Sequence, residues 1–436
     1  MKKFLYSVFM LAAVVLAACS NDDNGDIQPK RGMTLNASVE NLSSRATMTD
    51  ESGTWKFAFA VNDQVSVSNS KISNYYTFTN NGSQFTSAQA EATTENADWY
   101  AYFPGNEVDL KNQTGTFADV ANKFAVAGKT AQTTTGEKGL SITLKPKVAV
   151  LRVVAVDKKG ILDIHVKTTA DDKWVKGLTA TKNAAEFTVS TSDTKTTLLH
   201  KAEGTVNAGE INYVVVPAGV KIEIYNGDLL LNKTKDAGLT AGKYYTITSG
   251  PTKGTETATL ANGTTETVEW VQLWAGGPRF ATKNVAEEMT WTDAAKTGKN
   301  YAWGEKWRTP TAAEVTEEGG LQAEWNTKEG KWVVKEGSPT INVTTKDGIE
   351  ETVEFTGVQP GYTKNTLTLY NKIDSHGYSH FNFWTTTENN GYGCMYRIMI
   401  DKGIIGIFGP SSFESKDTKC LVRPVLSIQN ITNNKK

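Results

Sequence analysis

The sequence predicts a mainly β protein in which one or two β-sandwiches, over residues 31–250, precede a second domain of different composition. Two observations predict this. In the first region, apolar and polar residues alternate with a period of two, in short runs that end at Asn, Gly or Pro, as in strands and turns. After residue 267 lie eight of the eleven tryptophans, and a compositional shift of that size indicates a domain boundary.

The strands of the first region are predicted from separate runs. Ile142 to Val156 contains the densest apolar stretch and is predicted as a central strand buried on both faces. Residues 213–216 and 221–225 are predicted to pair through a Gly turn. Residues 251–267 are rich in Thr, Gly and Glu and are predicted as a linker. Further strands are predicted at 65–68, 76–79, 99–103 and 241–247.

The first residues have the pattern of an export signal. Lys2 and Lys3 precede an apolar run from Phe4 to Leu16, which is shorter than the roughly 20 residues that a membrane-spanning helix needs. A positive start followed by a short apolar run is typical of a cleaved signal peptide. Residues 1–18 are therefore predicted to be removed on export.

Cys19 is the predicted site of lipid attachment. The sequence Leu16-Ala17-Ala18-Cys19 resembles the lipobox of bacterial lipoproteins, in which the cysteine thiol takes a diacylglycerol and its freed amine a further acyl chain. An ordinary signal peptide with a chance cysteine is the alternative. Residues 19–30 are polar and acidic, cannot bury a core, and are predicted as a tether. They resemble the tethers that send some lipoproteins to the outer face of a Gram-negative outer membrane, which implies anchoring in outer-membrane lipid.

Residues 31–250 carry an ordered set of motifs: Arg45-Ala46-Thr47-Met48, Trp55, Asn62 to Val67, Asp98 to Pro104, Val216-Pro217-Ala218-Gly219 and Ala241 to Tyr245. Taken in this order, they resemble the fimbrillin family, the lipoprotein-derived pilins of type V pili. Where the family usually has Gly-Asp, this chain has Asn62-Asp63. The resemblance implies a fimbrillin-like β-sandwich of one or two transthyretin-like subdomains, a place in a surface fimbria, and other pilin subunits as partners through donor-strand exchange.

The segment before Arg45 is the predicted exchangeable strand. Met33, Leu35, Ala37 and Val39 alternate with polar residues, so one face is apolar and fills a groove in a half-open sandwich as an edge strand. In the resembled pilins, a trypsin-like cut at an arginine such as Arg45 removes this strand, and a neighbouring subunit's tail replaces it. The alternative is an ordinary first strand that is never removed.

Residues 268–428 carry a second set of motifs: Trp307-Arg308-Thr309-Pro310-Thr311, Pro360-Gly361-Tyr362, Trp384-Thr385-Thr386-Thr387-Glu388 and Val422-Arg423-Pro424-Val425. Within them, Thr309 is predicted to cap a helix that starts at Pro310. In this order the motifs resemble the major paralogous domain, which is similar to the C-type lectin-like fold. The resemblance implies an α+β lectin-like domain, followed by a polar tail at 429–436.

Cys394 and Cys420 are predicted to form a disulfide, because two cysteines in an oxidising compartment more often pair than stay free. The formal net charge of −1 and the lack of a basic stripe give no reason to expect nucleic acid as a partner. His376 and His380 have the spacing of a helical metal pair, but Gly377 and Tyr378 favour a loop. No catalytic motif is present, so no enzyme activity, metal or cofactor is expected.

Trp307 and Trp384 are predicted to lie in the core of the second domain, whereas Trp325 and Trp332 lie in a polar stretch and are candidate ligand contacts. The expected function is that of a fimbrial adhesin or accessory subunit that binds a glycan or host protein. Because only about ten polar residues follow Val425, this subunit is expected to accept a donor strand without giving one, at a filament tip. A non-polymerising surface lipoprotein and a secreted enzyme are the alternatives.

Overall fold

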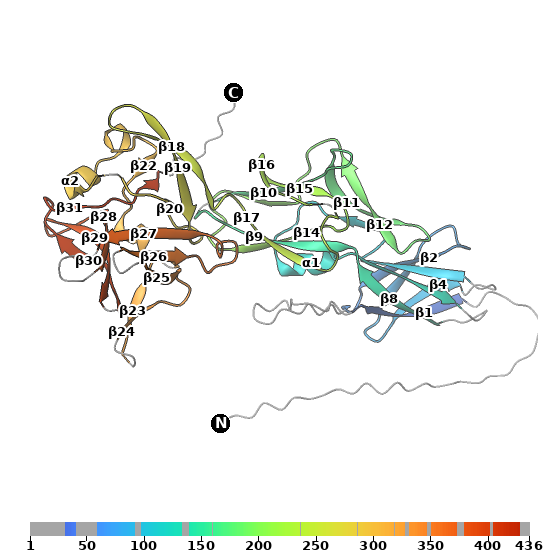
Figure 1. The fold of residues 1–436 in the computed structure, drawn as a ribbon. Helices are drawn as coiled ribbons and strands as arrows, with labels where there is room; N and C mark the ends of the chain where they lie inside the picture. Colours follow the sequence, from blue (N-terminus) through green and yellow to red (C-terminus); the bar gives the residue numbers. More distant parts are fainter. Residues whose placement is uncertain are drawn as a thin grey trace, which may run out of the picture.

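The computed structural model describes residues 31–40, 59–91, 97–132, 139–158, 160–235, 237–285, 287–317, 319–327, 331–346, 350–372, 379–401 and 404–427. The prediction of a mainly β protein is confirmed, since strands follow one another along the whole described chain. Figure 1 shows the strands in three groups, with the earliest strands at one end and the latest at the other. No helix of the described residues is long and apolar enough to span a membrane.

The first group is a closed barrel of seven strands in the order β1-β4-β3-β2-β5-β7-β8. It corrects the expected half-open sandwich at this end of the chain, because β1 and β8 pair and close the sheet on itself. The predicted strands at 65–68, 76–79 and 99–103 all form. The strands are β1 (Arg31–Val39), β2 (Gln64–Asn69), β3 (Tyr76–Asn80), β4 (Phe85–Glu91), β5 (Ala97–Phe103), β7 (Val126–Gln132) and β8 (Gly139–Pro146).

The second group is a two-sheet sandwich. Strand β9 (Val148–Val154) lies between β14 (Ile211–Pro217) and β17 (Tyr244–Thr248), and all its residues except Arg152 are buried, as predicted for a central strand. The predicted single strand over Ile142 to Val156 is wrong in extent, because its residues are divided between β8 of the barrel and β9. The facing seven-stranded sheet comprises β6 (Glu107–Asp109), β10 (Leu162–Thr168), β11 (Trp174–Thr181), β12 (Glu186–Ser192), β13 (Leu199–Lys201), β15 (Ile222–Asn226) and β16 (Leu229–Lys233).

One hydrophobic core joins this sandwich to the barrel, since buried side chains from Met33 to Ile247 form a single cluster. Helix α1 (Phe117–Lys123) packs beside β14. The predicted pairing of residues 213–216 with 221–225 is wrong. Strand β14 pairs with β9 and β15 pairs with β10, so the turn at Gly219 carries the chain from one sheet to the other.

The third group begins earlier than expected. Residues 251–267 are not a linker, because β18 (Lys253–Thr259) and β19 (Thr265–Gln272) form an antiparallel hairpin that opens a five-stranded sheet. Their exposed Thr and Glu side chains alternate with less exposed ones, as on an outer hairpin. The sheet continues with β20 (Arg279–Ala281), β32 (Val425–Leu426) and β22 (Trp307–Arg308).

Smaller sheets complete this domain. They are β21 (Met289–Thr290) with β31 (Lys419–Cys420), β23 (Ala323–Asn326) with β24 (Lys331–Val334), β25 (Thr340–Lys346) with β26 (Glu350–Thr356) and β27 (Thr366–Lys372), and β28 (Ser379–Asn389) with β29 (Tyr392–Asp401) and β30 (Ile404–Glu414). The helices α2 (Trp291–Ala294) and α3 (Ala312–Val315) have four residues each, and η1 (Gly298–Asn300) has three. The C-type lectin-like assignment stays a prediction.

Candidate functional site

Strand β1 occupies a groove between β4 and β8. It runs antiparallel to β4, from Arg31 to Leu35, and parallel to β8, from Thr34 to Val39. The expectation of an edge strand is therefore wrong where both neighbours pair with it, at Thr34 and Leu35. We call the space that β1 fills, with its walls β4 and β8, the β1 groove.

The apolar face of β1 matches the apolar face of β8 residue by residue. Three apolar pairs lie directly across from one another: Leu35 with Leu140, Ala37 with Ile142, and Val39 with Leu144. The β8 side chains of all three pairs are buried. The polar residues between them also face each other, and the Ser38 and Thr143 hydroxyls lie 3.4 Å apart. Such in-register pairs fix both the register and the direction of the strand in the groove.

Burial along β1 follows the predicted alternation. Met33 is 1% exposed and Leu35 is 0% exposed, while Ala37 and Val39 are half-buried against the same core. Asn36 and Ser38 are exposed. Burying a Met or Leu side chain contributes roughly 1.5–3 kcal/mol. Met33 and Leu35, in the first half of β1, therefore contribute most to holding the strand in the groove.

The chain returns to the β1 groove after the predicted cleavage segment. Phe59 packs edge-on against Phe85, the β4 partner of Leu35, with ring centroids 4.9 Å apart. Its ring also lies 5.2 Å from that of Phe103. Phe59 is thus held against the barrel through β4 and β5 as well as through the shared core. Arg45 itself and Cys19 lie outside the described residues.

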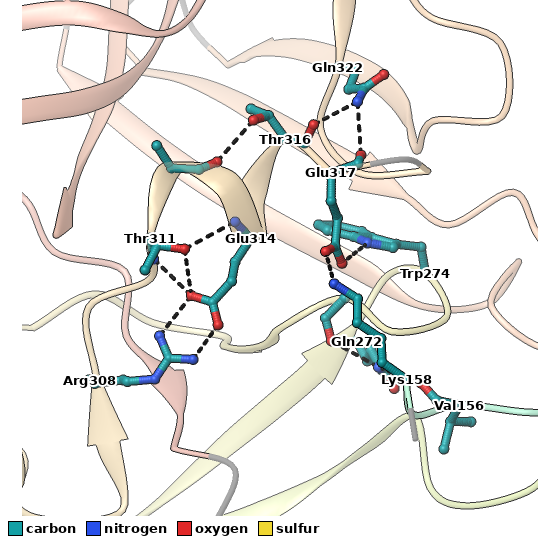
Figure 2. A network of polar contacts seen from close by, with 12 residues as sticks. Val156, Lys158, Gln272, Trp274, Arg308, Thr311, Glu314, Thr316, Glu317 and Gln322 are labelled. Carbon is teal, nitrogen blue, oxygen red and sulfur yellow. Dashed lines mark hydrogen bonds and ion pairs between the residues drawn. The ribbon is translucent and has the colours of Figure 1, made fainter. Parts of the chain in front are cut away.

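The Trp-Arg-Thr-Pro-Thr motif organises the third domain around α3 (Figure 2). The helix cap is Thr311, two residues later than predicted: its hydroxyl accepts from the Glu314 amide at 3.1 Å, and the Glu314 carboxylate accepts from the Thr311 amide at 2.8 Å. The two terminal guanidinium nitrogens of Arg308 donate to the two oxygens of the same carboxylate. Burial opposes ionisation of Glu314, yet these hydrogen bonds hold its pKa below the ordinary value. Thr309 is instead buried and donates to the Ala294 carbonyl at 2.6 Å.

Trp307 and Trp384 are fully buried, as predicted for core residues. Both lie in one hydrophobic cluster of the third domain. The Trp307 indole donates to the Thr257 carbonyl at 3.1 Å, and the Trp384 indole to the Met289 carbonyl at 2.8 Å. Their polar atoms are satisfied inside the core, so these tryptophans build the fold and are not ligand contacts.

The Pro-Gly-Tyr motif joins the third domain to the sandwich. Tyr362 is 0% exposed and packs against Val154 and Val156, in and just after β9. Beside it, Glu317 accepts from the Trp274 indole at 3.1 Å and pairs with Lys158 of the sandwich, as Figure 2 shows. In the sequence this motif served for the family resemblance, and its role at the joint was not predicted. An aromatic residue after Pro-Gly was the available signal.

Trp325 and Trp332, the candidate ligand contacts, lie on the β23–β24 hairpin (Figure 1). The register places them directly across from each other on the two strands. The backbone register therefore pairs two positions that the sequence separates by six residues. Their assignment as ligand contacts stays a prediction.

Cys394 and Cys420 are free, buried thiols, which corrects the predicted disulfide. Cys420 shares a hydrophobic cluster with Met395, the residue after Cys394 on β29. Successive residues of a strand point to opposite faces, so Cys394 is directed away from the cluster that holds Cys420. Burial raises the pKa of both thiols, that of Cys420 to about 12.

Of the two histidines considered as a metal pair, one is described by the structure. His380 lies in strand β28, and His376 falls outside the described residues. Within the described part of the chain, no group of three or more His, Cys, Asp or Glu residues is arranged to hold a metal ion.

No protein-family model matches the sequence, and no curated protein matches it. Among solved structures, a proposed cell adhesion protein from Bacteroides ovatus ATCC 8483 is similar at 9% identity and a TM-score of 0.33, over 56% of this chain and 96% of that one. A proposed cell adhesion protein from Bacteroides uniformis ATCC 8492 has 12% identity and a TM-score of 0.31, over 55% of this chain and 96% of that one. A fimbrial protein from Bacteroides ovatus ATCC 8483 has 11% identity and a TM-score of 0.25, over 92% of this chain and 100% of that one.

These three neighbours are described as adhesion or fimbrial proteins. All three TM-scores are below 0.5.

Proposed function

We propose that this chain is a lipid-anchored subunit of a surface fimbria, in which a neighbouring subunit's extended strand replaces β1 in the β1 groove. Cys19 holds the subunit in outer-membrane lipid at the cell surface, and a cut at Arg45 separates β1 from the folded body. The chain acts in assembly and adhesion rather than in catalysis.

The in-register apolar match between β1 and β8 carries this proposal. Leu35, Ala37 and Val39 face Leu140, Ile142 and Leu144, so any extended segment with apolar residues at every second position fits the same wall. Such a segment gains main-chain hydrogen bonds from β8 and burial from the core below. After a cut, Phe59 would keep the new N-terminal segment beside the groove through its ring contacts with Phe85 and Phe103.

The third domain is proposed as the adhesive part of a tip or accessory subunit. It lies at the opposite end of the molecule from the β1 groove (Figure 1). A strand bound in the groove therefore leaves this domain uncovered. Trp325 and Trp332, paired on the β23–β24 hairpin, are the proposed contacts for a glycan or host protein.

The test of strand exchange starts from the purified precursor and an Arg-specific protease. Cleavage should produce a new N-terminus at Ala46, and the cleaved protein should then bind a pilin subunit that carries an apolar tail. The Arg45→Lys variant keeps the charge and should resist both cleavage and assembly. Cleavage at other sites, or equal assembly by the variant, would overturn the proposal.

The position in the fimbria is tested with gold-labelled antibody to residues 253–427. Label at filament tips supports the proposed role, and label along the shafts refutes it. Diffuse label on cells without filaments would favour the non-polymerising lipoprotein.

A further inference from the structure

The two halves of β1 are held differently. From Arg31 to Leu35 the strand pairs with β4, and from Thr34 to Val39 it pairs with β8. Only Thr34 and Leu35 therefore have strand partners on both sides. Among the described strands, Asn36 to Val39 pair with β8 alone.

This asymmetry arises because the β3–β4 turn occupies the residues just before Phe85, where β4 would have to continue to pair with Asn36. Strand β4 begins at Phe85, the partner of Leu35, so it has no residue to offer to Asn36 and beyond. The preceding residues are held in the turn: the Asn81 side chain accepts from the Ser83 and Gln84 amides at 3.0 and 3.1 Å. The turn cannot extend β4 without losing these bonds.

Side-chain burial follows the same gradient. Met33 and Leu35 are 1% and 0% exposed, whereas Ala37 and Val39 are half-buried. At the far end, the Glu40 amide donates to the Leu144 carbonyl at 2.8 Å, and Glu40 pairs with Lys145 at 3.4 Å. Both charged side chains of that pair are well exposed, and exposed ion pairs add little stability.

We propose that β1 is exchanged by displacement from its Val39 end, with residues 36–40 as the entry point and residues 33–35 as the anchor. This rests on the proposed function. The entry point opens first, because a strand segment with one partner and partial burial opens locally at lower free energy than a doubly paired, buried one. An incoming extended strand then pairs with Ile142 and Leu144 of β8 and advances toward Leu35.

Two consequences follow for the partner and for regulation. The incoming strand runs in the direction of β1, parallel to β8, and engages through its C-terminal half. A cut at Arg45, on the C-terminal side of β1, does not by itself release the strand, because Met33 and Leu35 keep β1 docked in the groove. Proteolysis permits exchange, and the arriving strand drives it.

Hydrogen–deuterium exchange on the uncut protein tests the gradient directly. Amides of residues 36–40 should exchange at least tenfold faster than those of Thr34 and Leu35. This measurement depends neither on cleavage at Arg45 nor on any fimbria, so it separates a failure of this inference from a failure of the proposed function. Equal protection along β1, or faster exchange at residues 33–35, would overturn the inference.

The second test uses a protein with an engineered protease site in place of residues 43–46, cut after purification. The β1 fragment should stay with the body through gel filtration, and free peptide 31–40 should release it at a rate proportional to peptide concentration. Immediate loss of the fragment, or a release rate that does not depend on the peptide, would overturn the inference.

Two matched variants of the docked strand separate entry from anchoring. Val39→Ala should raise the peptide-dependent rate about fivefold and leave the spontaneous rate unchanged. Leu35→Ala should instead raise the spontaneous rate by tenfold or more. Asn36→Ala, at an exposed position, should leave the spontaneous rate unchanged. The reverse assignment of the first two effects would show that displacement starts at the Met33 end.

Discussion

Leu35 of β1 lies directly across from Leu140 of β8, and both side chains are buried. Replacing Leu35 by Ala leaves a cavity in the barrel wall, which should lower the free energy of unfolding by about 2–5 kcal/mol. Urea denaturation followed by tryptophan fluorescence measures the change. Asn36→Ala, one residue away on the exposed face, is the control and should be near neutral.

The joint between sandwich and third domain should depend on the ring of Tyr362 and not on its hydroxyl. Tyr362→Ala removes a buried ring packed on Val154 and Val156, at a cost of about 3–5 kcal/mol. The Tyr362 hydroxyl is buried without a hydrogen-bond partner among the described residues. Tyr362→Phe should therefore be neutral or slightly stabilising. Thermal unfolding compares them, and a strongly destabilised Phe variant would contradict this account.

Stability should fall in alkali because of Tyr102. Burial raises the pKa of Tyr102 from 10.0 to about 12. As the pH rises through 10, the unfolded phenol loses its proton first, so the unfolded state binds fewer protons and is favoured between about pH 10 and 12. Urea unfolding at pH 9 and pH 11 measures this loss.

Tyr102→Phe is the matched variant. It loses the hydrogen bonds to the Thr181 and Ala184 carbonyls, so it should be the less stable protein at pH 9. Its deficit should shrink at pH 11. Tyr392→Phe changes an exposed tyrosine and should leave the pH dependence as in the parent.

The two C-terminal cysteines should behave as protected thiols. Because burial raises the pKa of both, alkylation of native protein at pH 8 should be slow. In denaturant without reductant, both Cys394 and Cys420 should be alkylated in full. A linked peptide pair in non-reducing mass spectrometry of the exported protein would contradict the structure.

Cys19→Ala should abolish fatty-acid labelling and release the protein from the envelope, because a lipidated cysteine with several acyl chains is what makes membrane binding stable. Metabolic labelling with palmitate and fractionation of cells measure both effects. Retention of label on the variant would show that lipid is attached elsewhere or that Cys19 is not the acceptor.

The sequence was informative where burial alone decides the pattern. The alternation in β1 and the dense run of β9 predicted the buried faces correctly, because a strand shows its environment in its own residues. The residues of a strand do not identify the strands that pair with it. The alternation from Met33 to Val39 therefore could not predict that β8 pairs with β1 and closes the barrel.

The β18–β19 hairpin was mistaken for a linker because its exposed positions are Thr and Glu, which also suit linkers. The turn signal was present, since Asn262 and Gly263 separate the two strands, and the Asn262 side chain accepts from the Thr264 amide at 3.0 Å. The helix cap at Thr311 was placed two residues early because Thr309, unlike Thr311, precedes a Pro, a common first residue of helices. The cysteines were paired on compartment alone, although their opposite faces follow only from the strand register.

The parallel pairing of β1 with β8 has a consequence for biogenesis. The Ser38 and Thr143 hydroxyls that meet across these strands are 105 residues apart in the chain. In the proposed export the N-terminus emerges first, so β1 and the strands after it lack a closed sheet until Pro146 has followed. Throughout that interval the apolar positions of β1 and the edge of β4 are exposed to other chains. The proposed function therefore predicts that a periplasmic chaperone for extended apolar strands acts at this stage, before assembly into a fimbria.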